Sequence, residues 1–482
     1  MDLRLVSIKL QCKSGDISYP FNKNITALYG NIGVGKTSLM NLVSFCLGND
    51  LVRTLAIDEQ LLSCTLDTEY CGAFMSFTRK VSSNFITVKT KDSDIQLRVK
   101  DGYPECTISD YLYDLEGIQP LFWMPTKSTS THKKNRITFP NFYWFAYLKQ
   151  DEIDNSLFYF KDSQNYYKEI ASRNVLYSCL GGNSQSRTEF QDRIRNLSKA
   201  HDEITKKILF SNEIRDTTSL FTKDLSSEIV KKKREVLALK TTLDRFLPEN
   251  SQLTVDINLN ELLAIKYKIG LFEAELQYLA AFNKVKSVLD SQLIAKQQIE
   301  NNIDNIKLDH SYKNIGSNSL FEENLQTLNT LFQETLTRVG FPGMDAGDSI
   351  KLHPKDFSPI LYSYGGRKKA DFYTLSSGGK KTIYKICYGI AIHRLIKKNN
   401  LRTLIPQILV IDTPMKNISE REDAALYNSL FEVLYDLFRQ GGELEDVQLI
   451  LVDKELHPYF NKNNITAYHL TNEKPLIPFY RI

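Results

Sequence analysis

The sequence lacks long hydrophobic runs and any sign of a leader segment. No apolar run approaches the roughly 20 residues that a membrane-spanning helix needs, so we expect no transmembrane helix. The first residues, MDLRLVSIKLQCKSGD, carry charge within their first apolar stretch, and no cleavage site of small residues follows. We therefore expect no secretory signal peptide and a cytoplasmic protein.

The cysteine pattern argues against disulfide-rich and zinc-binding proteins, and the net charge does not identify a binding partner. The seven cysteines include no CxxC pair, and an odd number spread over 482 residues indicates reduced thiols and argues against zinc. A net charge of +4 is too small to identify a nucleic-acid-binding protein, although it permits a local basic surface. The 42% apolar and 24% charged residues are typical of a soluble globular chain of two or three domains, or of one large domain with an insertion.

The N-terminal part combines short strands with a helix. Residues 3–11 and 24–29 are predicted to be strands, and the second runs into a glycine-rich loop followed by a helix over residues 36–47. Between residues 61 and 99, four segments alternate apolar and polar residues and are separated by turn residues, which predicts an antiparallel meander. An aromatic-rich, strand-like run then ends at Asp154.

Two long segments, within residues 190–246 and 262–306, carry apolar residues at alternating steps of three and four. This spacing predicts a coiled coil, and Pro248 in LPENSQLTVD breaks it, so the chain turns back there. Each arm of about 50 residues would extend roughly 75 Å as a straight helix. We expect a projecting hairpin, because Gly and Pro are nearly absent and charged residues lie between the apolar ones. A hairpin packed along the globular body is the alternative.

The C-terminal part returns to an α/β pattern. A helix near residues 320–339 precedes strand-like segments, and the unbroken apolar runs PQILVIDTP and VQLILVDKE predict buried parallel strands. We therefore expect an α/β fold with a mixed sheet and an antiparallel β-meander, formed by residues 1–185 and 316–482. An antiparallel coiled-coil hairpin, residues 186–315 with its apex near 247–257, interrupts this fold.

The segment GNIGVGKT, from Gly30 to Thr37, matches G-x-x-x-x-G-K-[ST] between a predicted strand and a predicted helix. Its glycines let backbone N–H groups converge on phosphate oxygens, while Lys36 reaches the β- and γ-phosphates and Thr37 binds Mg²⁺. We therefore expect ATP and Mg²⁺ as cofactors; the alternative is a glycine-rich turn with a chance lysine. The predicted nucleotide-binding residues of this loop are Gly30, Asn31, Gly33, Gly35, Lys36, Thr37 and Ser38.

Two further segments suit a P-loop ATPase. ILVIDTP ends a predicted buried strand at Asp412, where a carboxylate can lie beside Mg²⁺, although an aspartate there can also cap the next helix. LSSGGKK places Ser377, Gly378 and Gly379 at the start of a helix, where small residues allow an anion to approach the backbone closely. A flexible loop with a helix cap is the alternative for this segment.

LSSGGKK resembles the signature motif of ABC-type ATPases, in which the motif of one subunit closes over the γ-phosphate held by another. Gln150, in YLKQDEID, lies where those ATPases carry their Q-loop. The resemblance implies that Gln150 contacts Mg²⁺ and the attacking water; a lone glutamine is otherwise an ordinary surface residue. The order of P-loop, Q-loop, hairpin, signature segment and Asp412 strand is similar to that of the SMC and RecF/RecN branch, where a coiled coil interrupts the ATPase head.

The sequence SSGGKK…VIDTPMKNISERED resembles that of the SMC-like subunits of Lamassu-type anti-phage defence systems. These resemblances imply an ATPase that dimerises head to head, with Lys36, Gln150 and Asp412 as catalytic residues and Thr37, Gln150 and Asp412 as metal ligands. They imply further that it acts on double-stranded DNA with an effector or nuclease subunit, in anti-phage defence or DNA repair. A scaffold that binds ATP without hydrolysing it is the alternative, and a transporter subunit fits the inserted hairpin less well.

Three features depart from the family pattern. Thr413 stands where the family places a glutamate that polarises the attacking water, and Asp453 stands where it places a switch histidine, with His457 nearby. The apex is short and has no cysteine, so neither a zinc hook nor a folded hinge is expected, and dimerisation through the apex is not expected either. Three downstream acidic residues either supply the missing carboxylate or form an exposed helix start: Glu420, Glu422 and Asp423.

Three basic segments are candidates for contact with the DNA backbone: residues 132–136, 231–234 and 365–369. Charge runs of this kind also occur as solvated surface. Residues 231–234 lie on a predicted arm and are equally suited to hold a partner protein.

Overall fold

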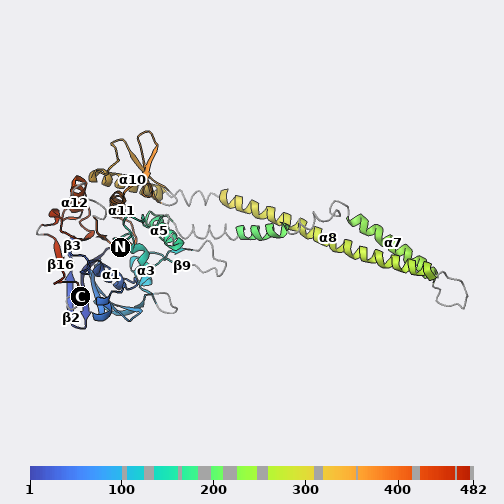
Figure 1. The fold of residues 1–482 in the computed structure, drawn as a ribbon, viewed down its shortest axis with the longest axis horizontal. Helices are drawn as coiled ribbons and strands as arrows, with labels where there is room; N and C mark the ends of the chain where they lie inside the picture. Colours follow the sequence, from blue (N-terminus) through green and yellow to red (C-terminus); the bar gives the residue numbers. More distant parts are fainter. Residues whose placement is uncertain are drawn as a thin grey trace. The chain divides into compact units, whose positions relative to one another are not determined.

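The computed structural model describes residues 1–99, 106–123, 135–160, 165–182, 197–209, 225–246, 259–308, 319–353, 357–414, 424–461 and 464–477. Its contacts divide the chain into two compact units (Figure 1). One unit consists of Met1–Thr188 together with Asn314–Ile482, and the other of Glu189–Lys313. The first unit is thus formed by two segments that are far apart in the sequence.

A six-stranded antiparallel sheet forms part of the first unit. Its strands, in order across the sheet, are β2 (Gly15–Pro20), β1 (Leu3–Cys12), β4 (Leu61–Tyr70), β5 (Ala73–Lys80), β6 (Phe85–Lys89) and β7 (Asp94–Arg98). Buried and exposed side chains alternate along β6, as expected for a sheet with one face on the core. The predicted meander over residues 61–99 is confirmed as β4 to β7, whereas β2 was not predicted.

A five-stranded parallel sheet forms the second layer of strands in this unit. Its strands, in order, are β10 (Tyr147–Leu148), β14 (Ile408–Asp412), β15 (Gln448–Asp453), β3 (Ile25–Gly30) and β16 (Thr466–Leu470). Every neighbouring pair is parallel, and β14 is buried along its whole length, so the two buried parallel strands predicted from their apolar runs are confirmed. Because the strands are parallel, the carboxyl ends of β3, β14 and β15 lie along one edge of the sheet.

The most deeply buried helix of the first unit is α11 (Gly378–Lys398), which packs against α10 (Ser319–Val339) and β14. It is buried from Thr382 to Ile396, and a Cβ atom on its Gly389 would lie 3.6 Å from side-chain atoms of Leu148 and Phe158. This helix therefore packs directly on the segment that follows β10. The other helices are α1 (Lys36–Cys46), α2 (Leu55–Gln60), α3 (Ile108–Glu116), α4 (Phe139–Tyr143), α5 (Tyr166–Cys179), α10 (Ser319–Val339), α12 (Ala424–Phe438) and the 3₁₀ helix η2 (Pro458–Phe460).

Two small sheets complete this unit. The strands β11 (Ser349–Leu352), β12 (Pro359–Tyr362) and β13 (Lys368–Asp371) form an antiparallel sheet directly before α11. The strands β8 (Phe122–Trp123) and β9 (Asn135–Arg136) form an antiparallel pair. The predicted α/β fold class, with a helical hairpin between two halves that share one sheet, is confirmed.

One local prediction was wrong. The aromatic run before Gln150 was expected to be strand-like throughout, but it begins as the helix α4 and only its last part, β10, is a strand. A capping box explains the helix, because Thr138 and Asn141 satisfy each other's backbone N–H groups and Pro140 suits a first helical turn. These local signals override the strand preference of the aromatic residues.

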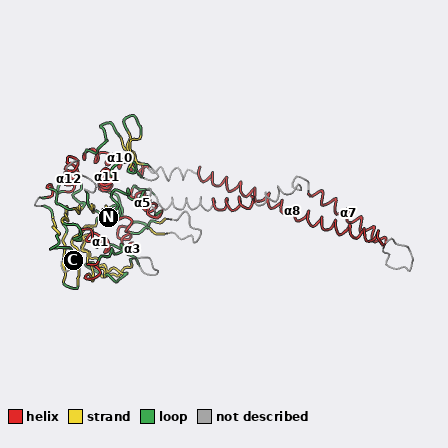
Figure 2. The backbone as a smooth tube through the Cα atoms, viewed as in Figure 1, coloured by secondary structure: helices red, strands yellow, loops and turns green. Residues whose placement is uncertain are grey.

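The second unit is an antiparallel helical hairpin. It contains α7 (Leu225–Phe246), a helical segment over residues 197–209, and the 50-residue helix α8 (Leu259–Leu308), drawn red in Figure 2. Ion pairs join the arms: Lys232 to Glu275 at 3.0 Å, and Lys240 to Glu273 at 2.5 Å. The predicted helical arms are confirmed for these residues. The apex near 247–257 and the seam residues Phe190, Ile194 and Phe221 lie outside the described part of the chain.

All seven cysteines are free thiols, as predicted. Within the part of the chain that the structure describes, no helix combines the length and the apolar character that crossing a bilayer would require.

Candidate functional site

The glycine-rich loop joins the end of β3 to the start of α1, and it is held between the ends of two neighbouring strands. The Gly30 N–H donates to the Lys454 carbonyl at 2.9 Å, and the Asn31 N–H donates to the Leu470 carbonyl at 3.2 Å. Gly30 has a φ of +132°, and a Cβ atom at this position would lie 1.8 Å from the Leu470 carbonyl oxygen. Only glycine therefore fits here, and the loop path depends on β16, which the sequence did not predict.

The start of α1 is open to an anion. Its first residue follows Gly35, which has a φ of +97°, and no side chain caps the helix. The free N–H groups of an uncapped first turn, together with the positive end of the helix dipole, attract phosphate. The Lys36 ammonium lies over the loop and donates to the carbonyls of Gly30 at 2.7 Å and Asn31 at 2.6 Å. Burial lowers the pKa of this amine, and the charges of Asp412 and Asp453 oppose that shift.

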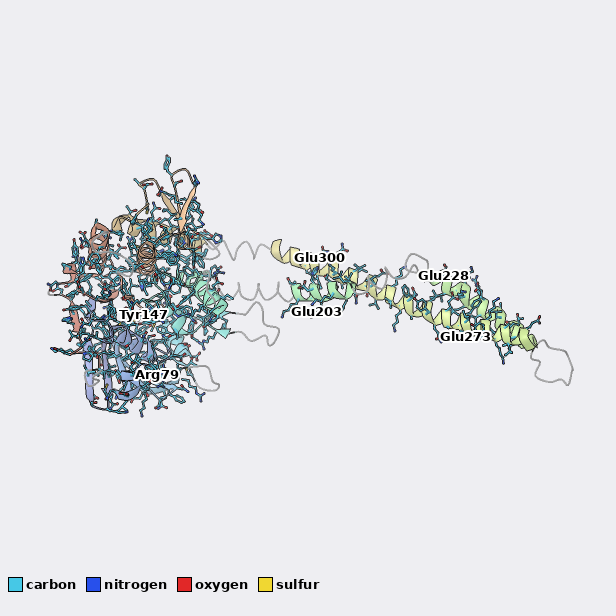
Figure 3. The ribbon with its side chains drawn as sticks, in the orientation of Figure 1. Arg79, Tyr147, Glu203, Glu228, Glu273 and Glu300 are labelled. Atoms are coloured by element: carbon cyan, nitrogen blue, oxygen red, sulfur yellow. The ribbon has the colours of Figure 1, made fainter. Side chains whose placement is uncertain are left out.

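Asp412, the last residue of β14, is fully buried and lies among hydroxyl groups. Its Oδ1 accepts a hydrogen bond from Thr413 at 3.2 Å, and its Oδ2 accepts one from the Tyr147 hydroxyl at 3.4 Å (Tyr147 is labelled in Figure 3). Burial raises the pKa of Asp412, and hydrogen bonds from Thr37, Thr413 and Tyr147 oppose the rise. A buried carboxylate whose charge is only partly compensated suits a cation.

A cavity of about 460 Å³ lies beside these groups and brings together the three residues predicted to bind the metal: Thr37, Gln150 and Asp412. A hydroxyl, an amide and a carboxylate are hard oxygen donors of the kind that Mg²⁺ takes beside substrate phosphates. The donor set therefore fits Mg²⁺. The complete lining is Thr37, Asn41, Val52, Tyr147, Lys149, Gln150, Asp151 and Asp412.

Asp453 ends β15, beside the P-loop strand, where it pairs with Tyr29. Its Oδ1 accepts a hydrogen bond from the Lys454 N–H at 2.7 Å. Burial raises the pKa of Asp453 to about 6, and the nearby charge of Asp412 adds to the rise. His457 does not take the place of a switch histidine, because its ring is buried, stacks on Phe431 and hydrogen-bonds Asn428 at 3.0 Å.

Thr413 has a left-handed backbone, with a φ of +61°. Such a conformation is rare for a β-branched residue, and it costs free energy that the surrounding structure must offset. Its N–H donates to the Val452 carbonyl at 2.7 Å, which fixes the turn after β14. The other acidic candidates for hydrolysis, Glu420, Glu422 and Asp423, lie outside the described residues.

The segment LSSGGKK forms the start of α11 and is not part of the cavity. Ser377 is the N-cap residue, and its side chain accepts a hydrogen bond from the Lys380 N–H at 3.2 Å. Ser377 is exposed, and the cavity lining includes neither it nor Gly378 or Gly379. The structure therefore brings together the P-loop, Gln150 and Asp412, and leaves the signature segment apart from them.

Several cavity residues were missed in the sequence, most clearly Tyr147, Lys149 and Asp151. Tyr147 is the first residue of the two-residue strand β10, Lys149 follows that strand, and no motif marks either of them. Their place depends on the pairing of β10 with β14, in which Tyr147 lies opposite Val410. Residues 265 positions apart, Tyr147 and Asp412, meet through that pairing.

No family model matches the chain, and no curated protein matches it. Among the solved structures that are similar to this chain, two match it over most of its length. One is the Smc head domain of Pyrococcus furiosus with an extended coiled coil, bound to the C-terminal domain of ScpA, at 12% identity and a TM-score of 0.44, covering 96% of this chain and 92% of that one.

The other is the Smc head domain of Pyrococcus yayanosii with a coiled coil and joint. It has 14% identity and a TM-score of 0.43, and the match covers 94% of this chain and 92% of that one. At identities and scores this low the similarity carries no argument about activity, and the chemistry rests on the residues of this chain.

Proposed function

We propose that this chain is an ATPase whose nucleotide site is completed by a second copy of the same chain. One observation carries the proposal. Thr37, Gln150 and Asp412 line a single cavity beside the P-loop, whereas Ser377 caps a separate, exposed helix start. Each copy then has a half-site that holds the nucleotide and a half-site that can close over the nucleotide of its partner. A head-to-head dimer with two composite sites satisfies both.

In this proposal the phosphates of ATP bind the N–H groups of Asn31 to Thr37, and Lys36 exchanges its bonds to the Gly30 and Asn31 carbonyls for bonds to phosphate oxygens. Thr37, Gln150 and Asp412 hold Mg²⁺, which neutralises phosphate charge when it is bound. The loop glycines and Ser38 complete the proposed contacts with the phosphates of ATP. Lys36, Gln150 and Asp412 are thus the proposed catalytic residues.

Double-stranded DNA is the proposed signal. The three basic segments differ in how many of their positive side chains are paired with acidic residues of the same chain. Lys368 and Lys369 are paired with Asp371 and with Asp345 and Asp348, and Arg136 is paired with Asp110. Residues 132–134 lie outside the described residues. On α7, Lys231, Lys233 and Arg234 are exposed. The 231–234 segment is therefore the best supported candidate for phosphate contacts.

We extend the proposal to a cellular role: nucleotide-driven head closure is coupled to DNA sensing and to control of an effector or nuclease subunit, in anti-phage defence or DNA repair. The order of the sequence motifs supports this role. Purification of the intact protein from its native cells, followed by identification of the proteins and nucleic acid that co-purify, tests it.

Thr413 favours a second candidate function, a scaffold that binds ATP and does not hydrolyse it. This residue carries no carboxylate at the place where the resemblance implies a water-polarising glutamate. Phosphate release by the wild type, measured with and without long double-stranded DNA, separates the two functions. Release no greater than that of Lys36→Ala would favour the scaffold.

The composite site itself is tested by dimerisation. Analytical ultracentrifugation with ATP and Mg²⁺ should give dimers for the wild type and monomers for Lys36→Ala and Ser377→Arg. Ser377→Arg should still bind ATP in the monomer, because Ser377 lies outside the cavity. If either variant dimerises with ATP as well as the wild type, the composite site is wrong.

A further inference from the structure

Hydrolysis at the proposed site needs a hydrogen-bond acceptor for the attacking water, and residue 413 does not provide a carboxylate. The Thr413 hydroxyl is instead directed to Asp412, to which it donates at 3.2 Å. The question of which group replaces the glutamate rests on the proposed ATPase function.

The carboxylates at the carboxyl edge of the parallel sheet differ in their availability. Asp412 is fully buried, and both of its oxygens accept hydrogen bonds from hydroxyl groups. Asp453 accepts the Lys454 N–H and is not part of the cavity lining. The remaining carboxylate that lines the cavity, among the residues that the structure describes, belongs to Asp151.

The backbone places Asp151 next to the end of the Asp412 strand. In the parallel pair β10–β14, Leu148 lies opposite Ile411, so the chain leaves β10 level with Asp412. Asp151 follows three residues later, and its side chain is exposed in the cavity wall. The register of the β10–β14 pair therefore determines how close Asp151 lies to Asp412.

Three hydrogen bonds fix the turn that carries Asp151. The Glu152 N–H donates to the Lys149 carbonyl at 3.1 Å, and the Asn155 side chain donates to the Asp151 carbonyl at 2.8 Å. The ammonium of Lys385, which is almost fully buried on α11, donates to the Glu152 carbonyl at 2.8 Å. These bonds fix the backbone position from which the Asp151 side chain extends, and a fixed position is what a catalytic group needs.

We propose that Asp151 is the carboxylate that accepts a hydrogen bond from the attacking water. The water oxygen forms a bond to the γ-phosphorus, and the bond from that phosphorus to the bridging oxygen of ADP breaks. The electron pair of the broken bond stays on ADP, and the proton that the water loses ends on the released phosphate. Asp151 orients the water during this step, as positioned carboxylates do in other hydrolases.

The first test is Asp151→Asn in the full chain. Loss of a positioned acceptor typically lowers turnover by about 10²-fold or more. Binding of a fluorescent ATP analogue and ATP-dependent dimerisation should stay at wild-type level, because Asp151 is proposed to act on the water. Asp94→Asn, at the exposed first residue of β7 with Lys89 at 3.9 Å, is the matched control and should keep wild-type turnover.

The second test is a rescue. Thr413→Glu, made in the Asp151→Asn background, should restore turnover at least tenfold, because it supplies a carboxylate at the neighbouring position. The backbone tolerates this change, since an unbranched glutamate is less strained than threonine at a φ of +61°. A merely structural role of Asp151 would not be rescued in this way.

The outcomes separate this inference from the proposed function. If the wild type releases no more phosphate than Lys36→Ala, the ATPase function and this inference both fail. If the wild type hydrolyses ATP and Asp151→Asn keeps more than half of its turnover, the inference alone fails. It also fails if Asp151→Asn loses nucleotide binding together with turnover, or if Thr413→Glu gives no rescue.

Discussion

The P-loop and the LSSGGKK segment are both glycine-containing turns at the start of a helix, but they differ in whether a side chain caps that helix. The start of α1 has no side-chain cap, and the beginning of the loop that leads to it is held by the chain at the ends of β15 and β16. The start of α11 is capped by Ser377, which is exposed. The first turn is built to receive an anion within one chain, and the second is already stable without one.

The charged residues near the P-loop also differ from those near the start of α11. Beside the P-loop lie the buried carboxylate of Asp412 and the half-buried carboxylate of Asp453, and the ammonium groups of Lys36 and Lys454 are close enough to oppose the rise in the pKa of Asp453. The first turn of α11 has no acidic residue, and Lys380 and Lys381 follow directly. The P-loop side therefore offers the buried carboxylate of Asp412 to a metal ion, while the start of α11 has no acidic side chain in its first turn that would repel a phosphate of another molecule. Each prediction below alters one side of this contrast.

The largest effect is expected at Gly30. Gly30→Ala would bring its Cβ against the Leu470 carbonyl, so the loop must move, and ATP binding should weaken by at least about 100-fold, or about 2.7 kcal/mol. Gly33→Ala is the matched control. Its φ of +84° costs about 1 kcal/mol, but no atom lies within 4 Å of the added Cβ, so its loss should stay below about tenfold.

Titration of ATP by isothermal calorimetry measures both variants. Equal losses for Gly30→Ala and Gly33→Ala would mean that enclosure of the loop by β16 is not what shapes the P-loop.

The next effect concerns Ser377 and separates its cap from its proposed contact. Ser377→Asp keeps an N-cap acceptor, so the melting temperature should stay near that of the wild type. Its negative charge would repel the phosphates of the partner's nucleotide, and ATP-dependent dimerisation should weaken at least about tenfold, or about 1.4 kcal/mol. Ser377→Ala should lose about 1 kcal/mol of stability and still dimerise.

Sedimentation with ATP, together with thermal melts, gives both quantities for each Ser377 variant. The contrast fails if Ser377→Ala weakens dimerisation and Ser377→Asp does not.

A smaller effect, with a defined sign, is expected for Asp453 in the nucleotide-free and metal-free protein. Its pKa of about 6 lies above the ordinary value of 3.8, so the folded state prefers the protonated carboxyl. The contribution of Asp453 to stability therefore falls as the pH rises from about 4 through 6. Asp453→Asn removes this loss, so its stability relative to the wild type should increase over that range.

Urea unfolding of both proteins between pH 4 and 8 checks the sign. A difference in unfolding free energy that does not change with pH would show that Asp453 is not held in a charge-unfavourable position.

The smallest effect is expected on the hairpin. Replacing Lys231 and Arg234 by alanine should reduce the slope of log K against log salt for double-stranded DNA by about 0.9 for each phosphate contact removed. Lys369→Ala should change that slope less, because Lys369 is paired with Asp345 and Asp348. Fluorescence anisotropy over a range of salt concentrations measures the slope. Identical slopes in all three proteins would remove the 231–234 segment as a DNA contact.

Much of the fold could be predicted because its signals are local. The P-loop residues are consecutive, and the meander and the arms follow the periods of strands and helices. The strand β14 is apolar throughout and is indeed buried throughout. The signature segment was expected at a helix start, and Ser377 lies there as the N-cap of α11.

The rest of the site could not be predicted because it depends on contacts between distant residues. Leu470 makes Gly30 obligatory only because β16 pairs with β3. Tyr147 reaches Asp412 through the register of a two-residue strand, which carries no periodic signal. The burial that raises the pKa of Asp453 is likewise a property of the packed sheet.

The central claim is that one copy binds the nucleotide and another copy closes over it. A mixture of Lys36→Ala and Ser377→Arg copies tests this most directly, because a dimer of one of each contains one doubly altered site and one intact site. Because neither variant is expected to dimerise alone, the dimers in an equal mixture are mixed ones and half of their sites are intact. The mixture should therefore recover up to about half of wild-type ATP hydrolysis, while each variant alone has none. Activity in either variant alone, or no recovery in a mixture shown to form mixed dimers, would contradict the account.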